Sequence, residues 1–332
     1  MKKINKILAV NFGGIGDEIL FLPALISLKK EFPNADITLA LEPRSKSVKD
    51  LTDTINDLIL VDIKNKNKYI ELIKFILKAR KEKFDMAITA GGNKFMSIIL
   101  WLTGIKKRYG YDCGLLSRIL LTKAVSLNKQ QYAAKMYHDL VSPITSNITE
   151  LPKINVKEQE KIPNSVLIHP GVSKMSIQKG MVKTVPAEVW AKTIDLLTSS
   201  GRKVILAGGP DDEECIETIL KTVTTDNFDN AYGKTKNLKE LAELIGKAEI
   251  FLCSDSAPLH VAVSMGTKTF AVFGPTDDKK LIPPNVVAIK AKDQCPLKPC
   301  LWDKRQTTCE NLDCLKITAE DILTYLSLDA DT

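Results

Sequence analysis

The chain has 332 residues, enough for about two domains that each bury a hydrophobic core. Apolar residues make up 44% of the sequence and charged residues 26%, which is typical of a folded globular protein and excludes disordered, collagen-like and coiled-coil chains. The longest apolar runs, such as residues 97–105, are too short to span a bilayer, and the N-terminal residues lack the apolar core and cleavage site of a signal peptide. We therefore expect a cytoplasmic protein.

The net charge of +7 is concentrated in the first half of the chain. Residues 1–150 carry 24 Lys and Arg against 15 Asp and Glu, whereas the remaining residues carry 23 against 25. The cluster Lys106-Lys107-Arg108 beside the apolar run Ile98–Leu102 favours an anionic membrane surface or an acidic glycolipid as partner. No nucleic-acid partner is expected, because zinc-finger spacing and basic stretches interleaved with aromatic residues are absent. Solvated lysines without a partner are the alternative interpretation.

In the first half, short apolar runs typical of strands alternate with amphipathic stretches typical of helices. The predicted strands are residues 6–12, 35–41, 57–62 and 84–90, and a predicted helix covers residues 69–83. This alternation implies parallel strands joined by right-handed crossovers, with helices on both faces of the sheet. We expect residues 1–150 to form one Rossmann-like domain, followed by a polar linker at 151–164 that contains two prolines.

The same alternation returns after the linker. Strands are predicted at residues 165–171, 203–209, 250–255 and 268–274, and helices at 186–201, from 211 onward, at 237–248 and at 257–266. We expect a second Rossmann-like domain at 165–317, and a last helix from residue 318, within the segment 318–332, that returns to the first domain. The predicted fold class is α/β, with two doubly wound domains facing a central cleft, since ligands bind at the carboxyl edge of such sheets.

A glycine-rich turn follows the first predicted strand. Gly14 and Gly16 allow close approach of the backbone and direct N–H groups toward an oxygen-rich ligand. The turn does not fit the dinucleotide fingerprint G-x-G-x-x-G, because Ile19 stands where the third glycine is required. Asp17 is placed at the start of the following helix, where it serves either as a general base or as a plain helix cap.

Polar residues follow four predicted strands of the second half, in the segments 169–173, 208–213, 254–260 and 274–277. Their convergence at one sheet edge predicts a site for a phosphate-bearing ligand. Asp255, Ser256 and Pro258 would cap and open a helix whose N–H groups hold a diphosphate. His260 is either a ligand contact or a buried core histidine, and Lys183 is either a phosphate partner or a solvated lysine.

These motifs, in this order, resemble glycosyltransferase family nine, the bacterial heptosyltransferases of the lipopolysaccharide inner core. The resemblance covers nearly the whole chain. In the first half it rests on Gly16-Asp17 followed by Pro23. In the second half it rests on His169-Pro170-Gly171-Val172, Lys183-Thr184-Val185-Pro186, Gly208, Gly209 and Glu213, Asp255 to His260, and Gly274-Pro275-Thr276. Two positions differ from the family pattern: Val185 replaces the family's Trp, and Ala257 replaces its Gly.

The resemblance implies a GT-B fold, with an acceptor-binding N-terminal domain and a nucleotide-sugar-binding C-terminal domain, and inverting transfer that needs no cofactor. By this resemblance Asp17 is the base, Lys183 stabilises the departing diphosphate, and Gly14 and Gly16 form the acceptor-side loop. Donor binding is expected at Gly171, Ser173, Gly209, Glu213, Asp255, Ser256, Ala257 and His260. The family's usual partners are ADP-heptose and a glycolipid acceptor, which would place the enzyme at the inner face of the inner membrane.

Two other functional classes stay open at this point. A sugar-nucleotide epimerase or a non-catalytic nucleotide-sugar-binding protein could use the same architecture, because a fold does not determine a function. A nucleotide-dependent oxidoreductase is disfavoured by the missing G-x-G-x-x-G turn.

Four of the seven cysteines lie close together near the C-terminus. Cys295, Cys300, Cys309 and Cys314 have the spacing C-x4-C-x8-C-x4-C. Four thiolates suit a structural iron or zinc ion, and a similar tail cluster in some family members looks like a structural iron site. Reduced free thiols are the alternative, whereas disulfides are disfavoured in the cytoplasm.

Overall fold

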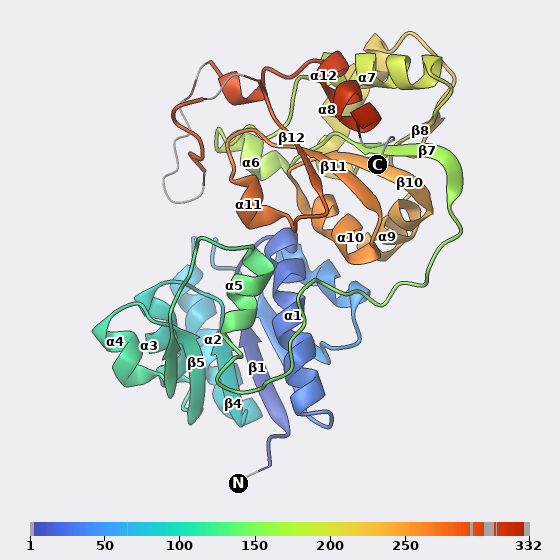
Figure 1. The fold of residues 1–332 in the computed structure, drawn as a ribbon. Coiled ribbons are helices and arrows are strands. Elements are labelled where there is room, and N and C mark those ends of the chain that lie inside the picture. Colours follow the sequence, from blue (N-terminus) through green and yellow to red (C-terminus); the bar gives the residue numbers. More distant parts are fainter. Residues whose placement is uncertain (1–2, 65, 293–294, 302–308, 310, 329–332) are drawn as a thin grey trace. The chain divides into compact units, whose positions relative to one another are not determined.

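The computed structural model describes residues 3–64, 66–292, 295–301, 309 and 311–328. The chain divides into two compact units, Met1–Asn155 and Val156–Thr332, and the boundary falls inside the segment expected to be a linker. Each unit is an open, fully parallel six-stranded sheet with helices on both faces (Figure 1).

The first unit has the strand order β3-β2-β1-β4-β5-β6. Its strands are β1 (Lys6–Val10), β2 (Asp36–Leu41), β3 (Asp57–Leu60), β4 (Met86–Thr89), β5 (Lys107–Tyr111) and β6 (Lys123–Val125). Its helices are α1 (Ile15–Glu31), η1 (Pro43–Leu51), α2 (Lys68–Glu82), α3 (Lys94–Leu102), α4 (Leu115–Leu120) and α5 (Ala133–Asp139). The order reverses between β1 and β4, and that reversal creates the crevice in which doubly wound sheets bind ligands.

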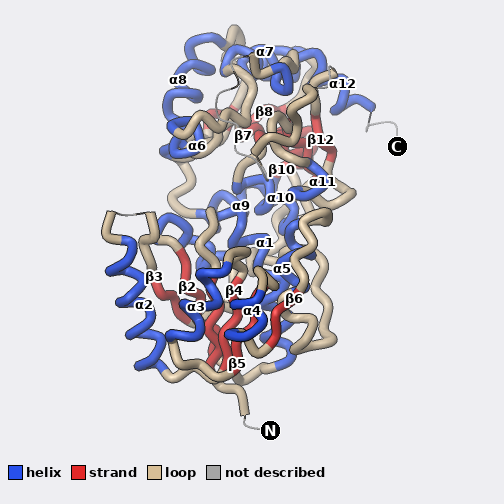
Figure 2. The backbone as a smooth tube through the Cα atoms, turned by 90° about the vertical axis from the view of Figure 1, so that its left-hand side faces the viewer, coloured by secondary structure: helices blue, strands red, loops and turns tan. Residues whose placement is uncertain are grey.

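Burial explains why the central strands and helix α1 of this unit consist mostly of apolar residues. Strands β1, β2 and β4 are nearly continuous apolar runs because both faces of a parallel sheet are covered by helices. Helix α1 is apolar on most sides because it lies between the sheet, η1 and α5. Helices α2, α3 and α4 lie next to one another on the opposite face of the sheet (Figure 2).

The second unit repeats this topology with the strand order β12-β11-β10-β7-β8-β9. Its strands are β7 (Ile162–His169), β8 (Lys203–Leu206), β9 (Asp229–Asn230), β10 (Ala248–Ser254), β11 (Lys268–Val272) and β12 (Val287–Ile289). Its helices are α6 (Lys174–Gln178), α7 (Ala187–Ser199), η2 (Pro210–Asp212), α8 (Glu213–Thr222), α9 (Leu238–Lys247), α10 (Ala257–Met265), α11 (Asp278–Leu281), η3 (Asp313–Leu315) and α12 (Ala319–Leu328). Here the order reverses between β7 and β10.

The last helix belongs to the second unit. Ile322 and Leu326 of α12 are buried in the core that α7 and Trp190 also form, and Lys192 of α7 pairs with Glu320 at 2.5 Å. The apolar face of this helix is covered by α7 inside the second unit, and the expected return to the first domain stays a prediction.

Several short strands have no counterpart among the predicted ones. Strands β5, β6, β9 and β12 were not recognisable because they are short and lie toward the sheet edges, and β5 has the polar sequence KRYGY. Within the described residues, every helix is too short or too polar to cross a membrane.

Candidate functional site

The turn between β1 and α1 holds Asp17 near the place where the first sheet reverses its order. Gly14 is the N-cap of α1, and Asp17 Oδ2 accepts a hydrogen bond from the Gly14 N–H at 2.8 Å. A Cβ on Gly13 would lie 2.3 Å from Cβ of Asp17, so only glycine fits beside this carboxylate. Asp17 thus does act as a helix cap, and because it remains exposed it is also accessible to a substrate.

Tyr137 from α5 contacts the same carboxylate. Its hydroxyl donates to Asp17 Oδ1 at 3.3 Å, across 120 positions of the sequence. Burial and the negative charge of Asp17 raise the pKa of Tyr137 well above its usual range, so this hydroxyl stays protonated and serves as a donor. Sequence reasoning missed Tyr137, since nothing local to α5 relates it to the glycine turn.

Glu18 is the second carboxyl group of this turn and was also missed. Its side chain is fully buried, and burial, followed by the charge of Asp17, raises its pKa well above the usual range. Its neighbour Asp17 is exposed, so the turn presents one solvent-facing carboxylate beside one carboxyl group that favours the neutral form. Pairs of acids in such different environments are typical of sites that handle protons.

A small basic cluster lies beside the turn. The buried carboxylate of Glu42 pairs with Arg44 Nε at 2.7 Å and with Lys64 Nζ at 2.9 Å. A Cβ on Gly14 would lie 3.8 Å from the Arg44 guanidinium and 3.7 Å from Asp17 Oδ2, so the cation and the carboxylate are near neighbours. This edge of the first sheet therefore combines a carboxylate with positive charge.

In the second unit, the structure brings Lys183 and Asp255 together. Lys183 Nζ lies 3.1 Å from Asp255 Oδ2, and the hydroxyl of Thr276 donates to the same oxygen at 2.7 Å. The three residues come from the segments that follow β7, β10 and β11, at the carboxyl edge of the sheet. Lys183 is thus held in place and is not a solvated loop lysine.

A buried network of hydroxyl groups fixes the loop that carries Lys183. The hydroxyls of Thr184 and Ser254 each donate to the carbonyl oxygen of Pro170 at 2.7 Å, and they lie 2.7 Å from one another. The indole N–H of Trp190 donates to Thr184 at 3.0 Å. The network ties the ends of β7 and β10 to the segment before α7, and this polar function of Thr184 and Ser254 was not predicted.

The predicted donor residues at the start of α10 occupy different environments. Ser256 is the N-cap in an extended conformation, and within the described structure its side chain makes no capping hydrogen bond to the helix. Ala257 and Pro258 are the first residues of α10, and Asp255, the partner of Lys183, lies just before this helix in the chain. His260 is buried, with 4% of its surface exposed, which fits the alternative of a core histidine.

Gly171 and Gly209 both contact Asp212, and only at Gly171 does the position of Asp212 require glycine. A Cβ on Gly171 would lie 1.7 Å from Asp212 Oδ1, and the Gly209 N–H donates to Asp212 Oδ2 at 2.8 Å. His169 Nε2 lies 3.7 Å from the same carboxyl group, too far for a hydrogen bond. Burial lowers the pKa of His169 and raises that of Asp212, so both favour their neutral forms. Asp212, and not the exposed Glu213, is the buried acid of this turn.

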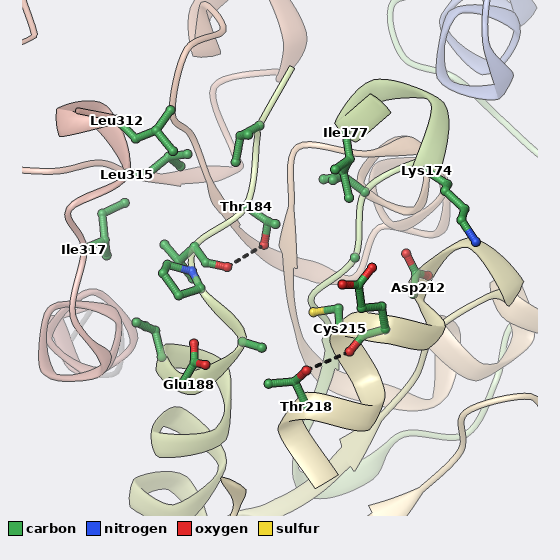
Figure 3. Close-up of a pocket in the computed structure, with 18 of the residues that line it drawn as sticks. Lys174, Ile177, Thr184, Glu188, Asp212, Cys215, Thr218, Leu312, Leu315 and Ile317 are labelled. Atoms are coloured by element: carbon green, nitrogen blue, oxygen red, sulfur yellow. Dashed lines mark hydrogen bonds between the residues drawn. The ribbon is translucent and has the colours of Figure 1, made fainter. Parts of the chain in front are cut away.

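A cavity of about 1130 Å³ opens next to this turn in the second unit. Figure 3 shows Thr184 and Glu188 on one side of it and Asp212, Cys215 and Thr218 on the other. Of the predicted donor residues, Gly171 and Glu213 line it. Its acidic lining consists of Glu188, Asp211, Asp212, Glu213, Glu214 and Glu217. Acidic side chains accept hydrogen bonds from hydroxyl groups, so this cavity suits the hydroxyl-rich sugar or ribose part of a nucleotide.

Ser173 is the last of the residues expected to bind the nucleotide-sugar donor. It is the N-cap of α6, and its side chain accepts a hydrogen bond from the Ser176 N–H at 3.2 Å. Its hydroxyl is therefore used by the helix in this structure.

The four clustered cysteines line one small cavity of the second unit. Cys295, Cys300, Cys309 and Cys314 are free, and burial together with the neighbouring cysteines raises the pKa of Cys314 to about 11. Among the described residues no group of three or more metal-ligating side chains is placed to hold an ion, so the expected iron or zinc is not supported.

Two Rossmann-like units in one chain, each with polar residues at its sheet reversal, are the architecture of a GT-B fold. The sequence profile of glycosyltransferase family 9 (heptosyltransferase) matches residues 72–310, and the chain belongs to this family of glycosyltransferases. Lipopolysaccharide heptosyltransferase 3 of Escherichia coli is 25% identical over 79% of this chain and 81% of the relative.

Solved structures agree on the fold. A family 9 glycosyltransferase from Veillonella parvula superposes with a TM-score of 0.76 at 22% identity, covering 100% of this chain and 99% of the other. The E. coli heptosyltransferase WaaC with ADP-2-deoxy-2-fluoro heptose gives a TM-score of 0.74 at 17% identity, covering 98% and 99%. The predicted α/β fold and the family resemblance are thereby confirmed.

Proposed function

We propose that the chain transfers heptose from ADP-heptose to a lipopolysaccharide-core-like glycolipid, with inversion at the anomeric carbon. The observation that carries this proposal is the Lys183 ammonium held at the carboxyl edge of the second sheet, just ahead of the N-terminus of α10. A lysine and a helix N-terminus together match the charge of a nucleoside diphosphate. The names of the relatives, which are heptosyltransferases of lipopolysaccharide, support the choice of sugar and acceptor.

The bond that breaks joins the anomeric carbon to the diphosphate. Negative charge grows on the departing ADP in the transition state, so a fixed ammonium stabilises the transition state more than the ground state. Lys183 supplies that ammonium. The acidic cavity beside Asp212 receives the hydroxyl-rich part of the donor.

The bond that forms joins an acceptor oxygen to the anomeric carbon. The acceptor hydroxyl must lose its proton as it attacks, and the exposed carboxylate of Asp17 takes it. Tyr137 holds this carboxylate through a hydrogen bond to its other oxygen, and the nearby cations Arg44 and Lys64 would contact anionic groups of the acceptor. Proton transfer and charge stabilisation are then supplied by protein side chains, and we propose that transfer needs no cofactor.

The experiment that tests this function offers ADP-heptose, UDP-sugars and GDP-sugars to the full chain together with a lipopolysaccharide-core acceptor and follows products by mass spectrometry. Transfer of heptose from the ADP donor is expected, with activity that a chelator leaves unchanged. Thermal shift with ADP, UDP, GDP and NAD provides a second readout, because a ligand that binds the native state raises the apparent stability. Transfer from another nucleotide sugar alone, or stabilisation by NAD alone, would reject the proposal.

A further inference from the structure

Large apolar side chains are exposed on one face of the first unit. Of the fourteen large hydrophobic residues that are exposed in the described structure, nine lie on α2, α3 and α4. They are Tyr69, Ile70, Ile73 and Leu77 of α2, Phe95 and Trp101 of α3, and Leu115, Leu116 and Ile119 of α4, each between 44% and 72% exposed. The three helices lie next to one another on one face of the sheet (Figure 2), and we call the exposed apolar residues on them the α2–α4 face.

Helix α2 is apolar on two opposite sides. Its inner side, with Phe75 and Ala79, packs on the core of the first unit. The outer residues Tyr69, Ile70, Ile73 and Leu77 follow the spacing i, i+1, i+4 and i+8, so they share a single side of the helix that faces away from the core. Exposed apolar patches of this kind mark interaction surfaces and are unusual on a monomer without a partner.

The charges around the α2–α4 face are mostly positive. The three helices carry Lys68, Lys74, Lys78, Arg80, Lys81, Lys94 and Arg118 against Glu71 and Glu82, a net charge of +5. Two of the lysines lie over aromatic rings of the face: Lys68 Nζ is 5.1 Å from the ring of Tyr69, and Lys94 Nζ is 5.9 Å from the ring of Phe95. Long cationic side chains beside exposed apolar groups suit an interface between hydrocarbon and anionic headgroups.

The structure adds exposed lysines on α2 to the basic residues that the sequence indicated. In the expected cluster at 106–108, Lys106 is exposed, whereas the guanidinium of Arg108 donates to the carbonyl oxygens of Leu120 and Ile105.

We infer that the α2–α4 face docks on the surface of an anionic bilayer, with its apolar side chains among the acyl chains and its lysines at the headgroups. A second copy of the chain is the other conceivable occupant. A two-fold contact through this face would place its cations opposite one another, whereas anionic lipids neutralise them. The inference goes beyond the proposed transfer reaction, and vesicle binding measures it without any transfer, so the two can fail independently.

The test uses sedimentation of the full chain with vesicles of phosphatidylcholine, with and without phosphatidylglycerol. Binding is expected only to the anionic vesicles and should weaken as salt rises. The double variant Ile73→Gln/Leu77→Gln should bind about tenfold more weakly or worse, since it removes two inserted side chains. The triple variant Lys74→Gln/Lys78→Gln/Lys81→Gln should lose a similar factor and most of the salt dependence.

Matched controls come from exposed positions of the second unit. Leu220→Gln and the triple variant Lys221→Gln/Lys239→Gln/Lys247→Gln change the same residue types and should bind like the unaltered chain. Brominated lipids should quench the fluorescence of Trp101, and this quenching should disappear in Trp101→Phe.

Three outcomes would overturn the inference. The first is an absence of binding to anionic vesicles. The second is binding that the α2–α4 variants and the controls affect equally. The third is a dimer in solution that Ile73→Gln/Leu77→Gln converts to monomer while vesicle binding is unchanged, which would assign the face to a second copy.

Discussion

The ammonium of Lys183 and the carboxylate of Asp255 form an ion pair at 3.1 Å across 72 residues of sequence. The Asp255 side chain is almost fully buried and that of Lys183 mostly so, with 3% and 23% exposed. A second donor, Thr276, occupies the same carboxylate oxygen, so the pair has a fixed geometry before any ligand arrives. A charge that is already oriented needs little reorganisation when negative charge develops beside it.

Replacement of this lysine should impair donor binding and turnover together. In Lys183→Ala we expect weaker binding of ADP and a fall in kcat of about 10²-fold or more, because the ammonium faces charge that is present in the bound donor and grows in the transition state. Calorimetry with ADP and steady-state kinetics measure the two effects. Lys179→Ala, which alters an exposed lysine of the same loop, should leave both unchanged. Normal turnover in Lys183→Ala would remove this residue from the mechanism.

Asp17→Asn separates the base from the helix cap. Asparagine can still accept the hydrogen bond from the Gly14 N–H, but it cannot take a proton from the acceptor. Transfer should therefore fall about 10²-fold or more, while ADP binding and the melting temperature stay nearly the same. If the variant retained near-normal transfer with a verified donor, Asp17 would be a cap only.

Tyr137→Phe tests whether the hydroxyl of α5 positions the base. Loss of its hydrogen bond to Asp17 should lower kcat roughly 5- to 10-fold with little change in KM, as expected for a bond worth about 1 kcal/mol. Tyr132→Phe is the matched control, since Tyr132 is largely buried and within the described structure its hydroxyl has no hydrogen-bond partner. Equal losses in the two variants would point to a general packing effect and against positioning.

Glu18 should make the stability of the first unit depend on pH. Its pKa is raised in the folded protein, so the folded state holds a proton that the unfolded state releases above its own pKa near 4.5. The contribution of Glu18 is therefore intact below that value and declines as the pH rises toward the folded pKa. Glu18→Gln carries no ionisable group at this position. At pH 8 its unfolding free energy should exceed that of the unaltered chain by roughly 1–3 kcal/mol, so it should melt at a higher temperature, and the difference should be smaller at pH 5. A difference in melting temperature that stays constant across this range would contradict the assignment.

The residues that sequence analysis found and those that it missed differ in their local signals. Lys183, Asp255 and Asp17 each follow an apolar strand in a polar or glycine-rich segment, so the carboxyl edge of a parallel sheet could be predicted for them. Tyr137, Thr184 and Ser254 carry no such signal, because their function depends on partners from remote segments. The choice between Asp212 and Glu213 likewise required the structure, since two adjacent acids look alike until one of them is buried.

The sequence by itself determined the two α/β units, the boundary region between them and the family, because strand and helix periodicity and glycine-rich turns are encoded locally. Tertiary structure alone decided which cations and carboxylates are paired, where α12 packs and which apolar residues remain exposed on α2, α3 and α4. Helix α2 is an example. The helical spacing of its apolar residues predicts two apolar sides, and only the position of the sheet determines which of them is buried. Side-chain pairing and burial arise from contacts between segments that are distant in the sequence, so a local sequence pattern cannot predict them.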